Sequence, residues 1–155
     1  MPKLAKGRLI QAALRARRMA VAPYSRFAVG AALVTAAGKI FTGANVESAS
    51  YGLTCCAERV ALFKALTEGA REFTGLAVAA RLEGGAMPCG ACRQLLAEYA
   101  PAARVFVVDT RRPSVVREFG VAELLPGAFL KFRPPPNDAP ATPGFRKRGS
   151  PPMKD

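Results

Sequence analysis

The chain has 155 residues, which indicates one domain, and half of them are apolar, enough to form a core. No run is long and apolar enough to span a membrane. The net charge of +12 points to nucleic acid, but the excess lies at the two ends. Residues 1–18 hold six bases and no acids, residues 131–155 hold six bases and two acids, and the middle keeps eleven bases and nine acids. We therefore do not expect a nucleic-acid partner, although non-specific binding by the ends stays open.

The two ends of the sequence are interpreted separately from the body. Residues 1–20 are basic but lack the apolar stretch and cleavage site of a signal peptide, so they are interpreted as an ordinary helix. A mitochondrial transit peptide stays open, because the segment contains arginine and no acid. Without an export signal the expected compartment is the cytoplasm, where four cysteines indicate metal binding or catalysis. Residues 134–155 are rich in Pro, Gly and charge and are expected to be a disordered tail behind a domain of residues 1–133.

The body alternates between helical and strand patterns. In chain order we expect a helix at Leu9–Ala20, strands at Phe27–Thr35 and Lys39–Glu47, a helix at Cys56–Glu68, a strand at Phe73–Ala80, a helix at Cys89–Tyr99, and strands at Arg104–Asp109 and Pro113–Phe119. In the first helix, Leu9, Ala13 and Met19 are inward candidates, and Gly69 is a natural C-terminal cap for the second.

The connections between these elements predict how the strands pair. A short link makes the first two strands an antiparallel hairpin, and a helix between the third and fourth makes them parallel. Only TRR joins the fourth strand to the fifth, which is too short for a crossover, so that pair is antiparallel. The sequence therefore predicts an α/β fold, a three-layer α-β-α sandwich with a mixed five-stranded sheet.

Cysteines stand at the start of two predicted helices. Cys89 and Cys92, in PCGAC, share one helix face and meet free N–H groups and the positive end of the helix dipole, which favours thiolate. Their spacing is typical of a zinc site, but zinc needs more than two ligands. The chain has no histidine, so the third ligand is expected to be Cys55 or Cys56.

Glu58 follows these cysteines in the first turn of the second helix. Three protein ligands leave one zinc position open, which is typical of catalysis, and a carboxylate there can move protons to and from water. Three alternatives are a structural four-cysteine zinc site, a redox CxxC pair, and inert buried thiols. The redox pair leaves Glu58 unexplained, and inert thiols explain one cysteine better than four.

Two segments, NVESASYGLTCCAERVALFKAL and PCGACRQLLAEYAP, closely resemble the small, homotetrameric zinc-dependent cytidine deaminases. APYSRFAVGAAL and ELLPGAF extend the resemblance over roughly residues 9–132. The resemblance implies that Cys56, Cys89 and Cys92 bind one Zn²⁺ per chain and that Cys55 is not a ligand. An antiparallel fifth strand also fits this branch rather than the polynucleotide deaminases, which typically have a histidine ligand.

The resemblance further implies hydrolysis of cytidine and deoxycytidine to uridine and deoxyuridine in cytoplasmic pyrimidine salvage. Water activated by zinc attacks C4, while Glu58 carries protons to N3 and to the departing amine. The implied substrate-binding residues are Phe27 (stacking on the pyrimidine), Asn45 and Glu47 (ribose hydroxyl), Tyr51, the backbone around Ala57 and Cys89 (base edge), and Phe129 from a neighbouring subunit. Apart from the resemblance, a core position is favoured for both phenylalanines, and Asn45 could cap a turn.

Arg59 is expected to support the metal site electrostatically. Three thiolates give a zinc site a net charge of −1, which weakens its pull on water, and a neighbouring arginine offsets that charge. An ordinary surface arginine is the alternative. Two functional alternatives also stay open: a deaminase of a modified nucleoside or an aminopyrimidine, and an inactive zinc-binding module, which would tend to lose Glu58.

Overall fold

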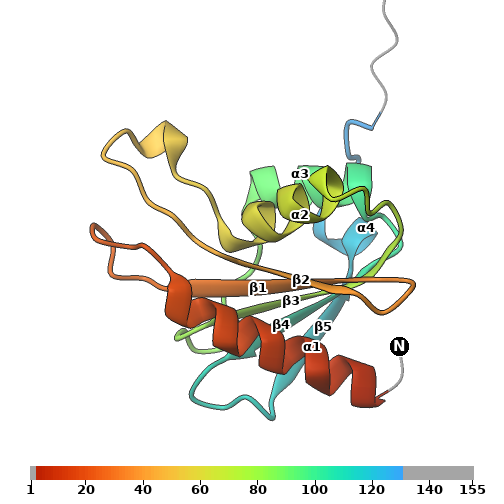
Figure 1. Ribbon diagram of the computed structural model, residues 1–155, viewed down its shortest axis with the longest axis horizontal. Coiled ribbons are helices and arrows are strands. Elements are labelled where there is room, and N and C mark those ends of the chain that lie inside the picture. Colours follow the sequence, from red (N-terminus) through yellow and green to blue (C-terminus); the bar gives the residue numbers. More distant parts are fainter. Residues whose placement is uncertain (1–2, 131–155) are drawn as a thin grey trace, which may run out of the picture.

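One mixed sheet with helices on both faces forms the body of the protein (Figure 1), for which a computed structural model describes residues 3–130. The strands are β1 (Val29–Thr35), β2 (Ile40–Ala44), β3 (Phe73–Ala80), β4 (Arg104–Asp109) and β5 (Val116–Gly120). The α-helices are α1 (Lys3–Ala16), α2 (Ala57–Thr67), α3 (Gly90–Tyr99) and α4 (Val121–Leu124), and two 3₁₀ turns are η1 (Arg17–Met19) and η2 (Tyr51–Leu53). Within residues 3–130 no helix has the length and apolar character needed to cross a bilayer.

The sheet order is β2-β1-β3-β4-β5, and only the β3–β4 pair is parallel. This confirms the predicted α/β sandwich, including the fifth strand antiparallel to the fourth. Strands β3 and β4 have the predicted bounds because both are almost wholly buried and leave a continuous apolar pattern in the sequence.

Helix α1 covers one face of the sheet alone. Leu9 and Ala13 are fully buried against β1, β3 and β4, as predicted, but Met19 is 75% exposed and that expectation was wrong. The regular helix ends at Ala16, and the tighter turn of η1 removes Met19 from the inward stripe. The helix also begins at Lys3 rather than Leu9, because its first turns add little to the apolar pattern.

Helices α2, α3 and α4 cover the opposite face. The strand residues alternate between the two layers, so that Leu33, Leu76 and Val107 face these helices while Val34 and Phe106 face α1. Helices α2 and α3 begin one residue later than predicted, because Cys56 and Cys89 are their N-cap residues with extended backbone. Gly69, with φ of +87°, follows the end of α2 as predicted.

The remaining differences from the predicted bounds lie where the chain leaves the sheet. Strand β1 begins at Val29, and β2 ends at Ala44, after which Val46 makes single bridges to Val21 and Cys55. Strand β5 starts at Val116, since proline at position 113 cannot donate to a ladder. Helix α4 has only four residues and was not predicted.

Three charged side chains tie α1 to the β5 edge of the sheet. Lys6 Nζ donates to Glu118 Oε2 at 2.8 Å, and Arg104 Nε donates to Glu118 Oε1 at 3.1 Å. Lys6 Nζ also lies 4.7 Å from the ring centroid of buried Phe106. These contacts join the helix to β4 and β5 at a partly exposed edge, where each ion pair adds little stability.

Glycine at position 43 lets the first turns of α2 approach β2 closely. A Cβ built on Gly43 would overlap the Ala57 carbonyl oxygen and the Ala61 nitrogen, which are backbone atoms. The start of α2 is therefore placed by direct packing of helix backbone on strand backbone.

We expect Gly43→Ala to lower the free energy of unfolding by at least about 2 kcal/mol, because the added methyl displaces α2. Gly7→Ala is the matched control, since nothing lies within 4 Å of its added Cβ in exposed helix; it should gain about 0.5–1 kcal/mol. Urea unfolding at one fixed protein concentration measures both. Equal stability of the two variants would contradict the close packing.

Candidate active site

Three cysteines meet where helices α2 and α3 begin. Cys56 is the N-cap of α2, Cys89 is the N-cap of α3, and Cys92 lies in the first turn of α3. The Sγ atoms of Cys56 and Cys89 are 3.7 Å apart, those of Cys89 and Cys92 are 3.5 Å apart, and all three lie within 4.8 Å of one another. Two positive helix ends therefore face one cluster of thiols.

This cluster fits a tetrahedral metal site. Zinc–sulfur bonds of 2.3 Å at tetrahedral angles separate two sulfurs by about 3.8 Å, close to the two distances found. The environment favours thiolate at Cys56: the hydrogen bond from the Cys92 thiol, with further ones from Cys89 and Arg59, lowers the pKa of Cys56 to about 5 despite its partial burial, and the same contact raises the pKa of the Cys92 thiol. The three side chains can hold a metal ion without rearrangement.

Cys55 lies outside this cluster. Its backbone pairs with Val46 in both directions at 2.9 Å, which fixes the chain as it enters α2. Successive side chains of extended chain point to opposite sides, so Cys55 and Cys56 diverge. Burial raises the pKa of the Cys55 thiol, so it is less readily ionised than Cys56.

Glu58 is a buried carboxyl group in the first turn of α2. Glu58 is only 5% exposed, and burial raises the pKa of its carboxyl group to about 7. The negative charge of the neighbouring Cys56 thiolate acts in the same direction. A carboxyl group with a pKa near neutrality can both take up and release a proton at cellular pH. Glu58 therefore has the protonation behaviour expected of a proton carrier.

Arg59 lies between the chain entering α2 and the cysteine cluster. Its Nη2 donates to the Thr54 carbonyl at 2.6 Å and lies 4.0 Å from Cys56 Sγ. Its Nε is buried and has no hydrogen-bond partner in the part of the chain that is described. The guanidinium is thus held beside the thiolates by the backbone, in a position to offset their charge.

Asn45 and Glu47 both hold the loop that precedes β1. Asn45 Oδ1 accepts from the Val29 N–H at 2.8 Å, and its Nδ2 donates to the Phe27 carbonyl at 2.9 Å. Glu47 Oε2 accepts from the backbone N–H groups of Tyr24 and Ser25 at 2.9 and 3.1 Å. Asn45 therefore holds the backbone of this loop, as the alternative turn-capping role expected.

The Ser25 hydroxyl donates to Glu47 Oε1 and accepts from the Phe27 N–H at 2.9 Å. The Ser25 hydrogen bond lowers the pKa of Glu47, which keeps the carboxylate ionised. Arg26 turns the loop sharply, with φ of +55°, just before Phe27. Phe27 is 37% exposed and is not a core residue. Together these contacts hold the backbone at Phe27 and leave its side chain partly exposed.

An open hollow of about 380 Å³ lies between this loop and the η2 segment. Its lining residues are polar or aromatic: Tyr24, Ser25, Glu47, Ser48, Tyr51 and Thr54. Glu47 and Tyr51, two of the residues expected to bind substrate, thus line one surface. Thr54 connects this surface to the cysteine cluster through its carbonyl contact with Arg59.

Tyr51 and Phe129 belong to segments at opposite ends of the molecule. The η2 segment (gold) projects from one end of the molecule, and the chain after α4 (blue) rises at the other (Figure 1). Both side chains are largely exposed, at 81% and 68%, so neither is a core residue. One copy of the chain therefore does not bring its own Tyr51 and Phe129 together.

Sequence reasoning missed Ser25 and two side chains of α3. Arg93 Nε donates to the Pro88 carbonyl at 2.7 Å and its Nη1 to the Leu124 carbonyl at 3.2 Å, while Gln94 contacts the backbone at Phe129. All three act on loops distant in sequence, which no local pattern reveals. The only available signal was their position inside the quoted motifs APYSRF and PCGACRQ.

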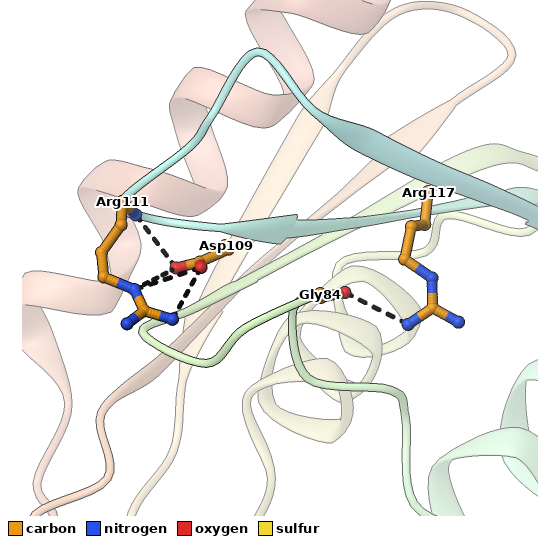
Figure 2. Close-up of polar contacts among 4 residues, drawn as sticks. All are labelled: Gly84, Asp109, Arg111 and Arg117. Atoms are coloured by element: carbon orange, nitrogen blue, oxygen red, sulfur yellow. Dashed lines mark hydrogen bonds and ion pairs between the residues drawn. The ribbon is translucent and has the colours of Figure 1, made fainter.

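A second hollow, of about 580 Å³, lies near the ends of β3 and β4 and contains no cysteine. Figure 2 shows that two of its three arginines are engaged: Arg111 donates to both carboxylate oxygens of Asp109, and Arg117 donates to the Gly84 carbonyl at 3.2 Å. Arg111 lowers the pKa of Asp109, which therefore remains ionised and is a poor proton donor. This hollow lacks the groups that the cysteine site combines.

Comparison with known proteins shows the family to which the chain belongs. The family model described as "Cytidine and deoxycytidylate deaminase zinc-binding region" matches residues 5–108. A cytidine deaminase of Halalkalibacterium halodurans is 52% identical over 122 residues, which cover 78% of this chain and 91% of that protein. A probable cytidine deaminase of Dictyostelium discoideum is 47% identical over 121 residues, covering 77% and 80%.

Solved structures that resemble this chain are also cytidine deaminases. The crystal structure of cytidine deaminase from Burkholderia pseudomallei superposes with a TM-score of 0.77 at 49% identity, covering 83% of this chain and all of that one. The enzyme from Mycobacterium tuberculosis gives a TM-score of 0.67 at 39% identity, covering 80% and 96%. The matched residues 5–108 contain the three clustered cysteines, Glu58, strands β1 to β3 and most of β4. The chain belongs to the cytidine and deoxycytidylate deaminase zinc-binding family.

Proposed function

We propose that this chain catalyses the zinc-dependent hydrolytic deamination of free cytidine and deoxycytidine to uridine and deoxyuridine, with release of ammonia. One observation carries the proposal. Glu58, a buried carboxyl group whose pKa is raised to about 7, lies in the first turn of the helix that Cys56 begins, beside the cluster of three cysteines. Relatives up to 52% identical are named cytidine deaminase, which supports the substrate class.

Cys56, Cys89 and Cys92 would hold one Zn²⁺ per chain. Zinc, when bound, supplies a Lewis acid that lowers the pKa of water. Three thiolates would give the zinc site a net negative charge, which weakens its pull on water. The chain offsets that charge with two helix N-termini and Arg59, which lie beside the cysteines.

Glu58 would move the protons of the reaction. It takes a proton from water as the oxygen attacks C4 of the pyrimidine and delivers that proton to N3. It then carries the remaining proton of the same oxygen, now a C4 hydroxyl, to the amine, and the C4–N bond breaks to release ammonia as the C4 carbonyl of the product forms. Burial suits the carboxyl group for both directions, because it raises the pKa to about 7. The presence of Glu58 argues against an inactive zinc-binding module.

The loop before β1 and the η2 segment would bind the nucleoside. Phe27, half-exposed at the mouth of the loop, stacks on the pyrimidine, and Ala57 and Cys89 offer backbone groups at helix starts, where N–H donors lack helical partners. Asn45 and Glu47 take the ribose hydroxyl, with Tyr51 nearby. Asn45 and Glu47 would each hold the loop and also bind the sugar.

The active assembly is proposed to be a homotetramer in which Phe129 of one copy completes the site of another. The wide separation of the η2 segment from the chain after α4 supports sharing (Figure 1). We propose residues 1–133 as the catalytic domain, acting in cytoplasmic pyrimidine salvage. The proposed tail, residues 134–155, lies outside the described residues, and the basic ends are given no nucleic-acid role.

A deaminase of a modified nucleoside or an aminopyrimidine remains the second candidate. It would share the cysteine cluster and Glu58 and would differ in the residues that contact the sugar. The Glu47 carboxylate, ionised and lining an open hollow, favours a substrate with a free sugar hydroxyl.

The two adjacent cysteines give the first prediction. Cys56→Ala should lose zinc and activity, because it removes one of the three clustered sulfurs, whereas Cys55→Ala, its neighbour outside the cluster, should keep both. Zinc per chain by elemental analysis and ammonia release from cytidine measure the two effects. The reverse pattern would show that Cys55 is the ligand.

Glu58→Gln preserves the size of the side chain and removes its ability to carry a proton. Turnover of cytidine should fall at least ~100-fold, the scale of general acid–base catalysis. Zinc content should stay at the wild-type level, so that lost activity is not lost metal. Near-normal turnover would remove Glu58 from the mechanism.

The substrate range tests the proposed function itself. We expect ammonia from cytidine and deoxycytidine, very little from free cytosine, and none detectable from a short cytosine-containing single strand. Free cytosine lacks the sugar hydroxyl that Asn45 and Glu47 are proposed to bind, so it loses those contacts, and a 3′-phosphate would meet the like charge of the ionised Glu47 carboxylate. Efficient action on the strand would overturn the free-nucleoside assignment.

A pair of variants separates sugar binding from loop anchoring. Glu47→Gln should reduce kcat/KM for cytidine with zinc retained, because it removes the ionised carboxylate. Ser25→Ala removes one anchor of the same carboxylate and leaves its charge, so its effect should be smaller. Equal losses in both variants would assign Glu47 to the loop alone.

A further inference from the structure

The side-chain amide of Gln94, on α3, holds the backbone of the chain segment that follows α4. Its Nε2 donates to the Phe129 carbonyl at 2.6 Å and to Glu98 Oε1 at 2.7 Å. Both partners are acceptors, so the nitrogen must face them, and both of its hydrogens are used. The amide is therefore held in one orientation by two contacts.

The segment held in this way presents an aromatic ring to solvent. Gly127 turns the chain with φ of +68°, Ala128 packs against the core, and Phe129 follows with its side chain 68% exposed. The Phe129 backbone is thus held by the packing of Ala128 before it and by the contact at its own carbonyl, while its ring is largely uncovered by the residues that the structure describes. A held backbone with an uncovered ring is suited to insert that ring into a partner.

Helix α3 also carries two of the clustered cysteines. Cys92 lies two residues before Gln94, and Arg93 between them fixes the Pro88 carbonyl, next to Cys89, and the Leu124 carbonyl of α4. The contacts of Arg93 and Gln94 join the metal-ligating start of α3 to both ends of residues 124–129. One short helix thereby supports the cysteine cluster of its own copy and the segment that carries Phe129.

We propose that Gln94 is a positioning residue for substrate binding in a second copy of this chain: it holds Phe129 in the orientation in which the ring enters that copy's nucleoside site. This inference rests on the proposed function, in which Phe129 completes a neighbouring site. Gln94 touches no substrate itself, and its effect passes through the Phe129 backbone.

The test compares three variants in the full chain with zinc content measured throughout. Gln94→Glu is nearly isosteric but places a carboxylate against the Phe129 carbonyl and Glu98, so it should raise KM for cytidine about fivefold to tenfold and change kcat little. Gln94→Lys restores a donor and should return KM toward wild type. Glu98→Ala, the matched control, removes the other partner of the amide but keeps the donor to the Phe129 carbonyl, so it should raise KM less than Gln94→Glu does.

A double-variant comparison assigns the effect to Phe129. Phe129→Ala alone should raise KM, and adding Gln94→Glu to it should raise KM no further, because the contact acts only through that ring. Additive effects of the two changes would overturn the positioning role. Unchanged KM in Phe129→Ala, or no deamination of cytidine by the wild type, would instead reject the shared site of the proposed function.

Fluorescence tests the positioning independently of activity. The chain has no tryptophan, so Phe129→Trp introduces a single reporter. In the assembled protein, checked by light scattering, its emission should be blue-shifted by burial against the second copy, and Gln94→Glu should shift it to the red. An emission maximum that is the same with and without Gln94→Glu would overturn the inference.

Discussion

The site depends on one constraint: two helices on the same face of the sheet must begin at the same place. Helix α2 is set there by direct backbone packing at Gly43, and α3 by the crossover that joins the parallel strands β3 and β4. Their N-terminal ends then bring Cys56 and Cys89 within 3.7 Å. The anionic cluster is stabilised by the same dipoles that its position creates, so the fold and the electrostatics of the site are inseparable.

The sequence predicted the sheet, its pairing and the cysteine chemistry because each left a local pattern. Buried strands such as β3 appear as continuous apolar runs, and the lengths of the links decide parallel or antiparallel pairing. The residues alone left Cys55 and Cys56 as equal candidates. The structure separates them, since Cys55 is held in a strand-like bridge and Cys56 caps the helix. The individual roles of these residues remain for experiment.

What the sequence could not predict depends on contacts between distant segments. Nothing local shows that Ser25 donates to Glu47, that Arg93 reaches Leu124, or that Gln94 reaches Phe129. The periodic pattern also misplaced Met19, because a switch from α to 3₁₀ geometry changes which side faces inward. Both the contacts that were not predicted and the wrong placement of Met19 involve loops or helix ends, where tertiary contacts outweigh local propensity.

The charged contacts on β5 have a consequence for aggregation. As the last strand in the order β2-β1-β3-β4-β5, β5 has one side without a strand partner among residues 3–130 and could template another chain. Arg117 and Glu118 lie in the middle of this strand, and Lys6 and Arg104 hold Glu118 in place. Adding a strand there would bring fixed charges and the end of α1 against the incoming chain. The fixed charges on β5 therefore make this edge a poor template for growth of the sheet into fibrils.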